Sequence, residues 1–163
     1  MSLRINNAQR FQPLHLPSVR RLATLLFRHT VRRTPGTRWS AVTLVLTDDP
    51  GIAAVKHATF GVHEITDVVT LCYAPSPADP GTEGEIFVNV QRAFTRPCRR
   101  GWSPARELAL YIAHGMDHLT GADDQAPDER RRMRERERRW IADPDCLDVI
   151  GRLAPPTADR PAR

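Results

Sequence analysis

The chain has 163 residues, of which 40% are hydrophobic and 26% charged, and a formal net charge of +5. A chain of this length buries about 70% of its unfolded surface on folding, which fits a single domain. No run of about 18 apolar residues occurs, so neither a membrane-spanning helix nor a membrane partner is expected. The N-terminus lacks the apolar core of a secretory signal, so we expect a cytoplasmic protein. The irregular spacing of Cys72, Cys98 and Cys146 indicates free, mostly buried thiols.

Hydrophobic periodicity and turn residues predict alternating strands and helices along the chain. In chain order they are a strand at 3–7, a helix at 16–33, a strand at 40–47, a helix at 48–61, strands at 67–73 and 85–90, and helices at 91–96, between Ser103 and Gly121, and at 127–143. The helix after Ser103 begins with Pro104, which is a common pair of N-cap and first helical residue. Residues 74–84 are rich in Pro and Gly and predict a flexible loop.

Residues 114–124 read HGMDHLTGADD and contain the last two histidines of the chain, His114 and His118. Two imidazoles at i and i+4 of a helix present their nitrogens to one point, which suits a metal ion. Gly121 fits the position that ends the helix, so the chain can fold back and bring Asp124 to the same point. Two histidines, one aspartate and an open fourth position are typical of a catalytic zinc site rather than a structural one.

These residues predict one Zn²⁺ per chain, held by His114, His118 and Asp124, and another divalent cation is the alternative. Histidines at this spacing also occur by chance at the flank of a helix, so a site without metal stays open. Helical rotation places Asp117 nearly opposite the core, as a solvated surface charge. The general base is not identified: Asp123 and Glu85, and also Asp67, are candidates by position only, and each also suits a capping or ligand-orienting role.

The elements predict an α+β (mixed α/β) fold with a small, mostly parallel or mixed sheet of about four strands. Helices pack with this sheet around a central helix that carries the metal ligands, in a zincin-like arrangement. Residues 1–154 are expected to form the single domain, and residues 155–163 a disordered C-terminal tail.

With this helix and its flanks, the chain resembles the YbeY-type endoribonuclease family of rRNA maturation factors, whose motif is HGxLHLxGYDH. Matching positions are held by His114, Gly115, His118, Leu119, Gly121 and Asp123. Three upstream blocks also look like the family, in the same order: TDVVTLCY at 66–73, GEIFVNVQRA at 84–93 and SPARELALYIAHG at 103–115. The likeness covers residues 40–141 approximately.

The resemblance implies one zinc ion, cleavage of single-stranded RNA and a role in rRNA maturation and ribosome quality control. RNA and the small ribosomal subunit are then the expected partners. His114 and His118 carry over as metal ligands, whereas Asp124 replaces the family's third histidine and Asp117 its leucine. Phe60 replaces the arginine of a YRG-like triplet that the family uses in RNA cleavage. These departures leave open a catalytically weakened factor that binds RNA during ribosome assembly.

A zinc metallopeptidase that closes its site with HxxGxxD is a further alternative. HExxH peptidases carry a glutamate after the first histidine as the base for the attacking water, but Gly115 stands there in this chain. Peptidase chemistry of that kind therefore lacks its usual base.

The candidate RNA-binding residues are Arg99, Arg100 and Trp102, which lie just upstream of the metal helix. Arginine side chains pair well with phosphate oxygens. Residues 128–139 also hold seven arginines against four acids. For this segment we favour a solvated helix with salt bridges over an RNA-binding surface, since Glu135 and Arg139 lie at the i,i+4 spacing.

Overall fold

The computed structural model describes residues 2–77 and 79–155, so the predicted tail, apart from Pro155, lies outside the described residues. Its elements are β1 (Ser2–Asn7), α1 (Leu16–Arg33), β2 (Trp39–Thr47), α2 (Asp49–Phe60), β3 (Val68–Tyr73), β4 (Thr82–Asn89), α3 (Val90–Thr95), α4 (Pro104–His118), α5 (Pro127–Ile141) and α6 (Pro144–Ile150). Within these ranges, no helix combines the length and the hydrophobicity needed to cross a membrane.

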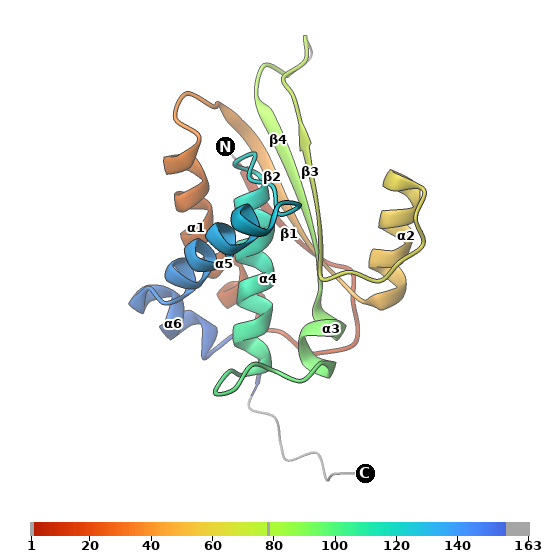
Figure 1. The fold of residues 1–163 in the computed structure, drawn as a ribbon, viewed down its shortest axis with the longest axis vertical. Helices are drawn as coiled ribbons and strands as arrows, with labels where there is room; N and C mark the ends of the chain where they lie inside the picture. Colours follow the sequence, from red (N-terminus) through yellow and green to blue (C-terminus); the bar gives the residue numbers. More distant parts are fainter. Residues whose placement is uncertain (1, 78, 156–163) are drawn as a thin grey trace.

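The four strands form one mixed sheet in the order β1-β2-β4-β3 (Figure 1). β2 pairs in parallel with both β1 and β4, whereas β3 pairs antiparallel with β4 and is an edge strand. In Figure 1, α1, α4, α5 and α6 are grouped on one side of the strands, and α2 lies apart from them on the other side. The predicted α+β fold with a small mixed sheet of four strands is confirmed.

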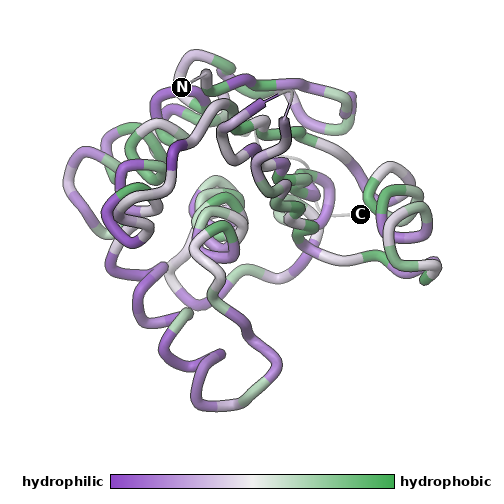
Figure 2. Tube along the Cα trace, turned by 90° about the horizontal axis from the view of Figure 1, so that it is seen from above, coloured by the Kyte–Doolittle hydropathy of each residue, from purple (hydrophilic) through white to green (hydrophobic). Residues whose placement is uncertain are grey.

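Helix α4 lies near the centre of the molecule, and more hydrophilic segments lie outside it (Figure 2). Its Leu108, Ile112 and Met116 are fully buried. A Cβ atom at Gly115 would lie only 2.3 Å from Cγ2 of Ile86 on β4, so this glycine allows close contact between helix and sheet. The C-terminal end of α4 is thereby held against β3 and β4.

Both ends of α4 agree with the sequence. Ser103 is the N-cap, and its hydroxyl accepts a hydrogen bond from the backbone N–H of Arg106 at 3.2 Å. Beyond the helix, Gly121 has φ +80°, a conformation that favours glycine. The chain turns there, and the carbonyl of Ala122 comes back to 2.9 Å from Nδ1 of His118.

Two segments differ from the predictions. Residues 144–150 form α6, which the sequence analysis did not predict; Asp143 caps it by accepting from the N–H of Asp145 at 2.9 Å. β4 begins at Thr82, so the predicted loop at 74–84 is shorter than expected. The three cysteines are free as predicted, but only Cys146 is buried.

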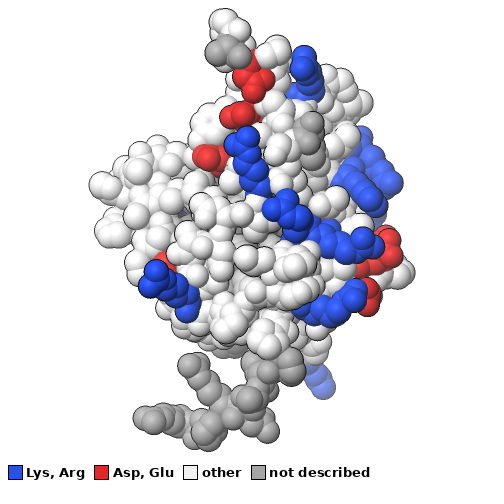
Figure 3. Space-filling model, turned by 180° about the vertical axis from the view of Figure 1, so that it is seen from behind, with Lys and Arg blue, Asp and Glu red and all other residues white. Residues whose placement is uncertain are grey.

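Exposed arginines occur on several elements, among them α1, α5 and the loop after α3. Seen from behind, Lys and Arg side chains occupy several places on the surface beside a broad uncharged area (Figure 3). The net charge of +5 therefore does not by itself locate a nucleic-acid site. Only the arrangement of particular side chains can do so.

Candidate metal centre

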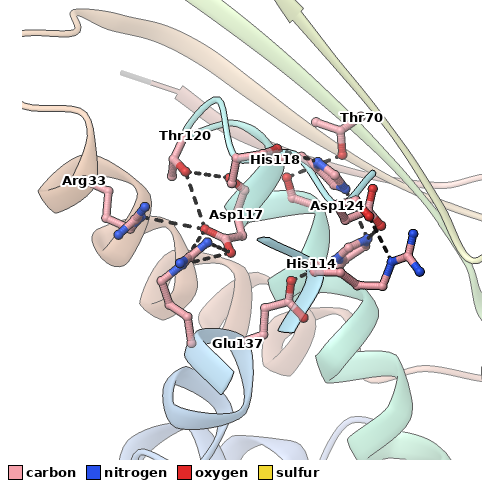
Figure 4. Close-up of polar contacts among 12 residues, drawn as sticks. Arg33, Thr70, His114, Asp117, His118, Thr120, Asp124 and Glu137 are labelled. Carbon is pink, nitrogen blue, oxygen red and sulfur yellow. Dashed lines mark hydrogen bonds and ion pairs between the residues drawn. The ribbon is translucent and has the colours of Figure 1, made fainter. Parts of the chain in front are cut away.

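His114 and His118 face one another at the C-terminal end of α4, and Asp124 approaches them from the following loop (Figure 4). The two Nε2 atoms are 3.1 Å apart, and Oδ2 of Asp124 lies 3.8 Å from Nε2 of His114. One potential ligand atom from each residue lies within 4.8 Å of the others. The structure thus brings together the three ligands that the sequence predicts, in a group that could hold a metal ion.

The other nitrogen of each ring faces a hydrogen-bond acceptor. Nδ1 of His114 lies 2.7 Å from Oε1 of Glu137, and Nδ1 of His118 lies 2.9 Å from the carbonyl oxygen of Ala122. A carboxylate and a carbonyl only accept, so Nδ1 is assigned as the protonated nitrogen of each ring, and Nε2 is the nitrogen available to a metal ion. The 3.1 Å between the two Nε2 atoms suits a proton shared in a hydrogen bond as well as a cation bound by both rings.

The distances fit a divalent cation. Zinc–nitrogen bonds of about 2.0–2.1 Å at a tetrahedral angle put two ligand nitrogens about 3.3–3.4 Å apart. The observed Nε2–Nε2 distance of 3.1 Å is close to this value. The carboxylate of Asp124 is slightly farther away, and its side chain is 40% exposed, so it has room to adjust.

Glu137 contacts the candidate metal group, and the sequence analysis missed it. It lies on α5, is only 2% exposed and orients the ring of His114. Burial lowers the pKa of His114, but the hydrogen bond and the charge of Glu137, together with Asp124 and Asp117, raise this pKa above its ordinary value. Its position four residues after the buried Met133 was the available signal, because that spacing puts Glu137 on the apolar face of α5.

Asp117 is fully buried, so its prediction as a solvated charge is wrong. Its carboxylate accepts hydrogen bonds from Nε of Arg136 at 3.0 Å and from Nη2 of Arg136 at 2.6 Å. Nε of Arg33 lies 3.7 Å away, on α1 (Figure 4). Helical rotation did place Asp117 away from the sheet, but α1 and α5 cover that side of α4.

Glu85 points away from the histidines. Its neighbours Gly84 and Ile86 contact α4, and adjacent side chains of a strand point to opposite faces of the sheet. The carboxylate of Glu85 instead accepts a hydrogen bond from the hydroxyl of Tyr73 at 2.9 Å. This position gives Glu85 no route to the metal group, so the structure does not favour it as the base.

Asp123 and Asp67 lie closer to the group. The carboxylate of Asp123 is exposed in the loop beside Asp124 and accepts a hydrogen bond from the N–H of Gln125 at 3.1 Å. Asp67 lines the cleft beside His114, but its carboxylate is ion-paired with Arg92. Of these two carboxylates, only that of Asp67 is held by an ion pair among the described residues.

Two hollows flank the histidine pair. One, of about 290 Å³, lies on the His114 side, between α4 and α5. The other, of about 300 Å³, lies on the His118 side and is lined by residues of α2 and β3, including Phe60 and Lys56.

Of the predicted RNA-binding residues, only Arg99 lines the hollow beside His114. It is ion-paired with Glu107, and its guanidinium lies 5.3 Å from the ring centroid of Trp102. Trp102 packs against the core and under Arg106 at 4.3 Å. Arg100 is exposed but does not line that hollow. The structure thus brings Arg99 to the site, and not Arg100 or Trp102.

The contact at Gly115 also bears on the peptidase alternative. In HExxH enzymes this position carries the glutamate that serves the attacking water. Here it faces the sheet, where even a Cβ atom would meet Ile86 and lie 3.2 Å from Cγ1 of Val68. A side chain from this position has no path to the histidines in this fold.

Fold and site together define a mixed α/β protein with a His/His/Asp group at the end of its central helix. The family model described as "Endoribonuclease YbeY" matches residues 4–144. The chain therefore belongs to the endoribonuclease YbeY family, which confirms the resemblance seen in the sequence.

Individual relatives agree with this assignment. Endoribonuclease YbeY of Chlamydia pneumoniae is 29% identical over 144 residues, which are 84% of this chain and 87% of the relative. That of Salinibacter ruber is 31% identical over 112 residues, or 65% and 71% of the two chains. The solution structure of a Thermotoga maritima protein has a TM-score of 0.56 at 19% identity and covers 91% of this chain and 89% of that one. At this identity the structural likeness shows the fold alone.

Proposed function

We propose that this chain is a metal-dependent endoribonuclease that cleaves single-stranded RNA in ribosomal RNA maturation and ribosome quality control. Its proposed partners are rRNA and the small ribosomal subunit. Membership of the family supports the class of reaction. Metal dependence is supported above all by one observation: two Nε2 atoms lie 3.1 Å apart while both Nδ1 atoms face acceptors.

His114, His118 and Asp124 would hold one divalent cation, with zinc the first candidate because imidazole and carboxylate are common zinc ligands. Such a cation supplies Lewis-acid chemistry, since it activates water and offsets charge that develops on a phosphoryl group. Glu137 fixes the ring of His114, and the carbonyl of Ala122 fixes that of His118. For proton transfer we keep Asp123 as the candidate, because its exposed carboxylate neighbours Asp124.

Removal of the metal is the direct test of this function. Protein stripped with a chelator should lose cleavage of a fluorescent single-stranded RNA, and added zinc should restore it. Elemental analysis of the purified protein should give one metal ion per chain. Full cleavage by protein that elemental analysis shows to be metal-free would refute the proposal.

A second candidate function is a factor that binds RNA without cutting it. Phe60 favours it: this side chain is 57% exposed and lines the hollow beside His118, where the family resemblance leads one to expect an arginine. Lys56 lines the same hollow, but its ammonium is paired with Glu64 at 2.6 Å. This candidate predicts RNA binding with no cleavage in zinc, manganese or any other divalent metal.

The role of Glu137 gives a separate prediction. Glu137→Gln keeps the size of the side chain but removes the charge that holds His114, so zinc affinity should fall about 10–100-fold. A competition titration against a chromophoric chelator measures this affinity. The matched control is Glu135→Gln, an exposed position of the same helix. Equal zinc affinities for the two variants would show that Glu137 does not support the site.

A further inference from the structure

Helix α5 has a buried face and a basic face. Met133, Glu137 and Trp140 are buried against the rest of the protein. Arg134 and Arg138 are exposed. With Arg130, they recur every four residues, so the three side chains follow one face of the helix over about 12 Å.

This basic face borders two hollows. The first is the one beside His114, whose lining includes Arg130 and Arg134. The second, of about 430 Å³, is lined by Pro127, Arg130, Arg131, Arg134, Glu135 and Arg138. Because both hollows include Arg130 and Arg134, they adjoin along α5.

A third hollow adjoins at the opposite end. It shares Asp67, Arg99 and Tyr111 with the hollow beside His114 and extends to Arg96. Burial and, next, the charge of Asp67 raise the pKa of Tyr111 to about 12, so its phenol stays protonated as a hydrogen-bond donor. A series of arginines therefore runs from Arg138 past the metal group to Arg96.

Among the arginines that line these hollows, Arg99 is ion-paired with Glu107 and Arg131 with Asp128. The predicted ion pair between Glu135 and Arg139 is not formed: Arg139 donates instead to the backbone carbonyl of Glu135 at 3.2 Å. The ion pairs that α5 makes with described residues are Arg131–Asp128, Arg136–Asp117 and Glu137–His114. Across residues 2–77 and 79–155, Arg134 and Arg138 form no ion pair. The expected Glu135–Arg139 salt bridge is thus absent, whereas the helix is exposed as expected and carries the Arg131–Asp128 pair.

We propose that Arg96, Arg99, Arg134 and Arg138 form an arginine track that binds the phosphates of single-stranded RNA on both sides of the metal group. The guanidinium fork matches phosphate oxygens, and such contacts position a strand without reading its sequence. Because the hollow in the middle of the track includes His114 and Asp124, a strand bound along it lies with a phosphodiester beside the proposed metal ligands. The inference rests on the proposed function for the identity of the polymer.

Salt dependence of RNA binding tests the track. Arg134→Gln with Arg138→Gln removes two arginines of the track, and Arg132→Gln with Arg139→Gln removes two exposed arginines of the same helix outside these hollows. Each single-strand phosphate contact contributes about 0.7 to the slope of log K against log salt, so loss of two should flatten the slope by about 1.4. This corresponds to affinity about 25-fold weaker at 0.1 M salt and unchanged near 1 M.

Fluorescence anisotropy with a short labelled RNA measures this slope, within the time in which a gel shows no cleavage. Thermal melting checks that both double variants remain folded. The control variant should keep the wild-type slope, although it loses the same net charge. Equal slopes for the two double variants would overturn the track.

The same experiment separates the track from the nuclease proposal. If the wild-type chain cleaves no RNA but the slopes differ as expected, the nuclease proposal fails and the track stands. If the wild-type chain cleaves RNA but replacement of Arg134 and Arg138 leaves the salt slope unchanged, the track fails and the nuclease proposal stands.

Discussion

Replacing both His114 and His118 with asparagine should abolish RNA cleavage and leave the fold intact. The amide nitrogen of asparagine occupies the place of Nδ1, so the hydrogen bonds to Glu137 and to the carbonyl of Ala122 can be kept. Both Nε2 atoms are lost, and with them the facing lone pairs that would hold the cation. Since a metal contributes several kcal/mol to such a reaction, the rate should fall about a thousandfold or more.

The chain supplies a matched control for this double variant. His57 and His63 are also a neighbouring pair, with ring centroids 5.9 Å apart, but both are exposed and neither lies in the metal group. Their replacement with asparagine should leave both metal content and cleavage unchanged.

Thermal stability gives a readout of the histidine pair that does not depend on activity. Zinc at about 100 times its dissociation constant should stabilise the wild-type fold by about 2.7 kcal/mol. It should not stabilise the variant that lacks His114 and His118. Wild-type cleavage by that variant would contradict the assignment of the two histidines.

The part of the site that could be predicted from sequence depends on local geometry. The helical period brings His114 next to His118, and a glycine turn returns Asp124 to them a few residues later. Ser103 likewise predicts where α4 begins, and Gly121 predicts the turn that follows the helix. Each of these inferences uses a short segment whose conformation is fixed by its own residues.

The parts that were missed depend on which distant elements pack together. Glu137 reaches His114 only because α5 folds back along α4, and helical rotation alone could not show that α1 and α5 cover Asp117. The orientation of Glu85 follows from the face of β4 that meets α4, which periodicity within one strand does not reveal. For α6 a local signal did exist, because Asp143 and Pro144 are a common start of a helix.

Asp117 shows how a departure from the family motif is accommodated in three dimensions. The motif that the sequence resembles has leucine at this position, and an unpaired aspartate buried there would be strongly unfavourable. Arg136 on α5 supplies the opposite charge, with Arg33 on α1 nearby. This pair joins α4 to α5 one residue away from both His118 and Glu137.

Replacing Asp117 with alanine should therefore lower the free energy of unfolding by about 3–5 kcal/mol, because Arg136 is left partly buried without its counter-charge. Urea unfolding of the metal-free protein measures this loss. Asp148→Ala is the control: it removes an exposed i,i+4 partner of Arg152 and should cost about 1 kcal/mol or less.

The double replacement of Asp117 with leucine and Arg136 with methionine separates the cost of an unpaired charge from the value of the pair. Apolar side chains that replace a buried ion pair leave stability similar or higher, so this variant should unfold near the wild-type urea midpoint. If Asp117→Ala cost no more than Asp148→Ala, the buried pair would not be what joins α5 to α4. If the double variant were as unstable as Asp117→Ala, the loss would come from packing at this position rather than from the orphaned arginine.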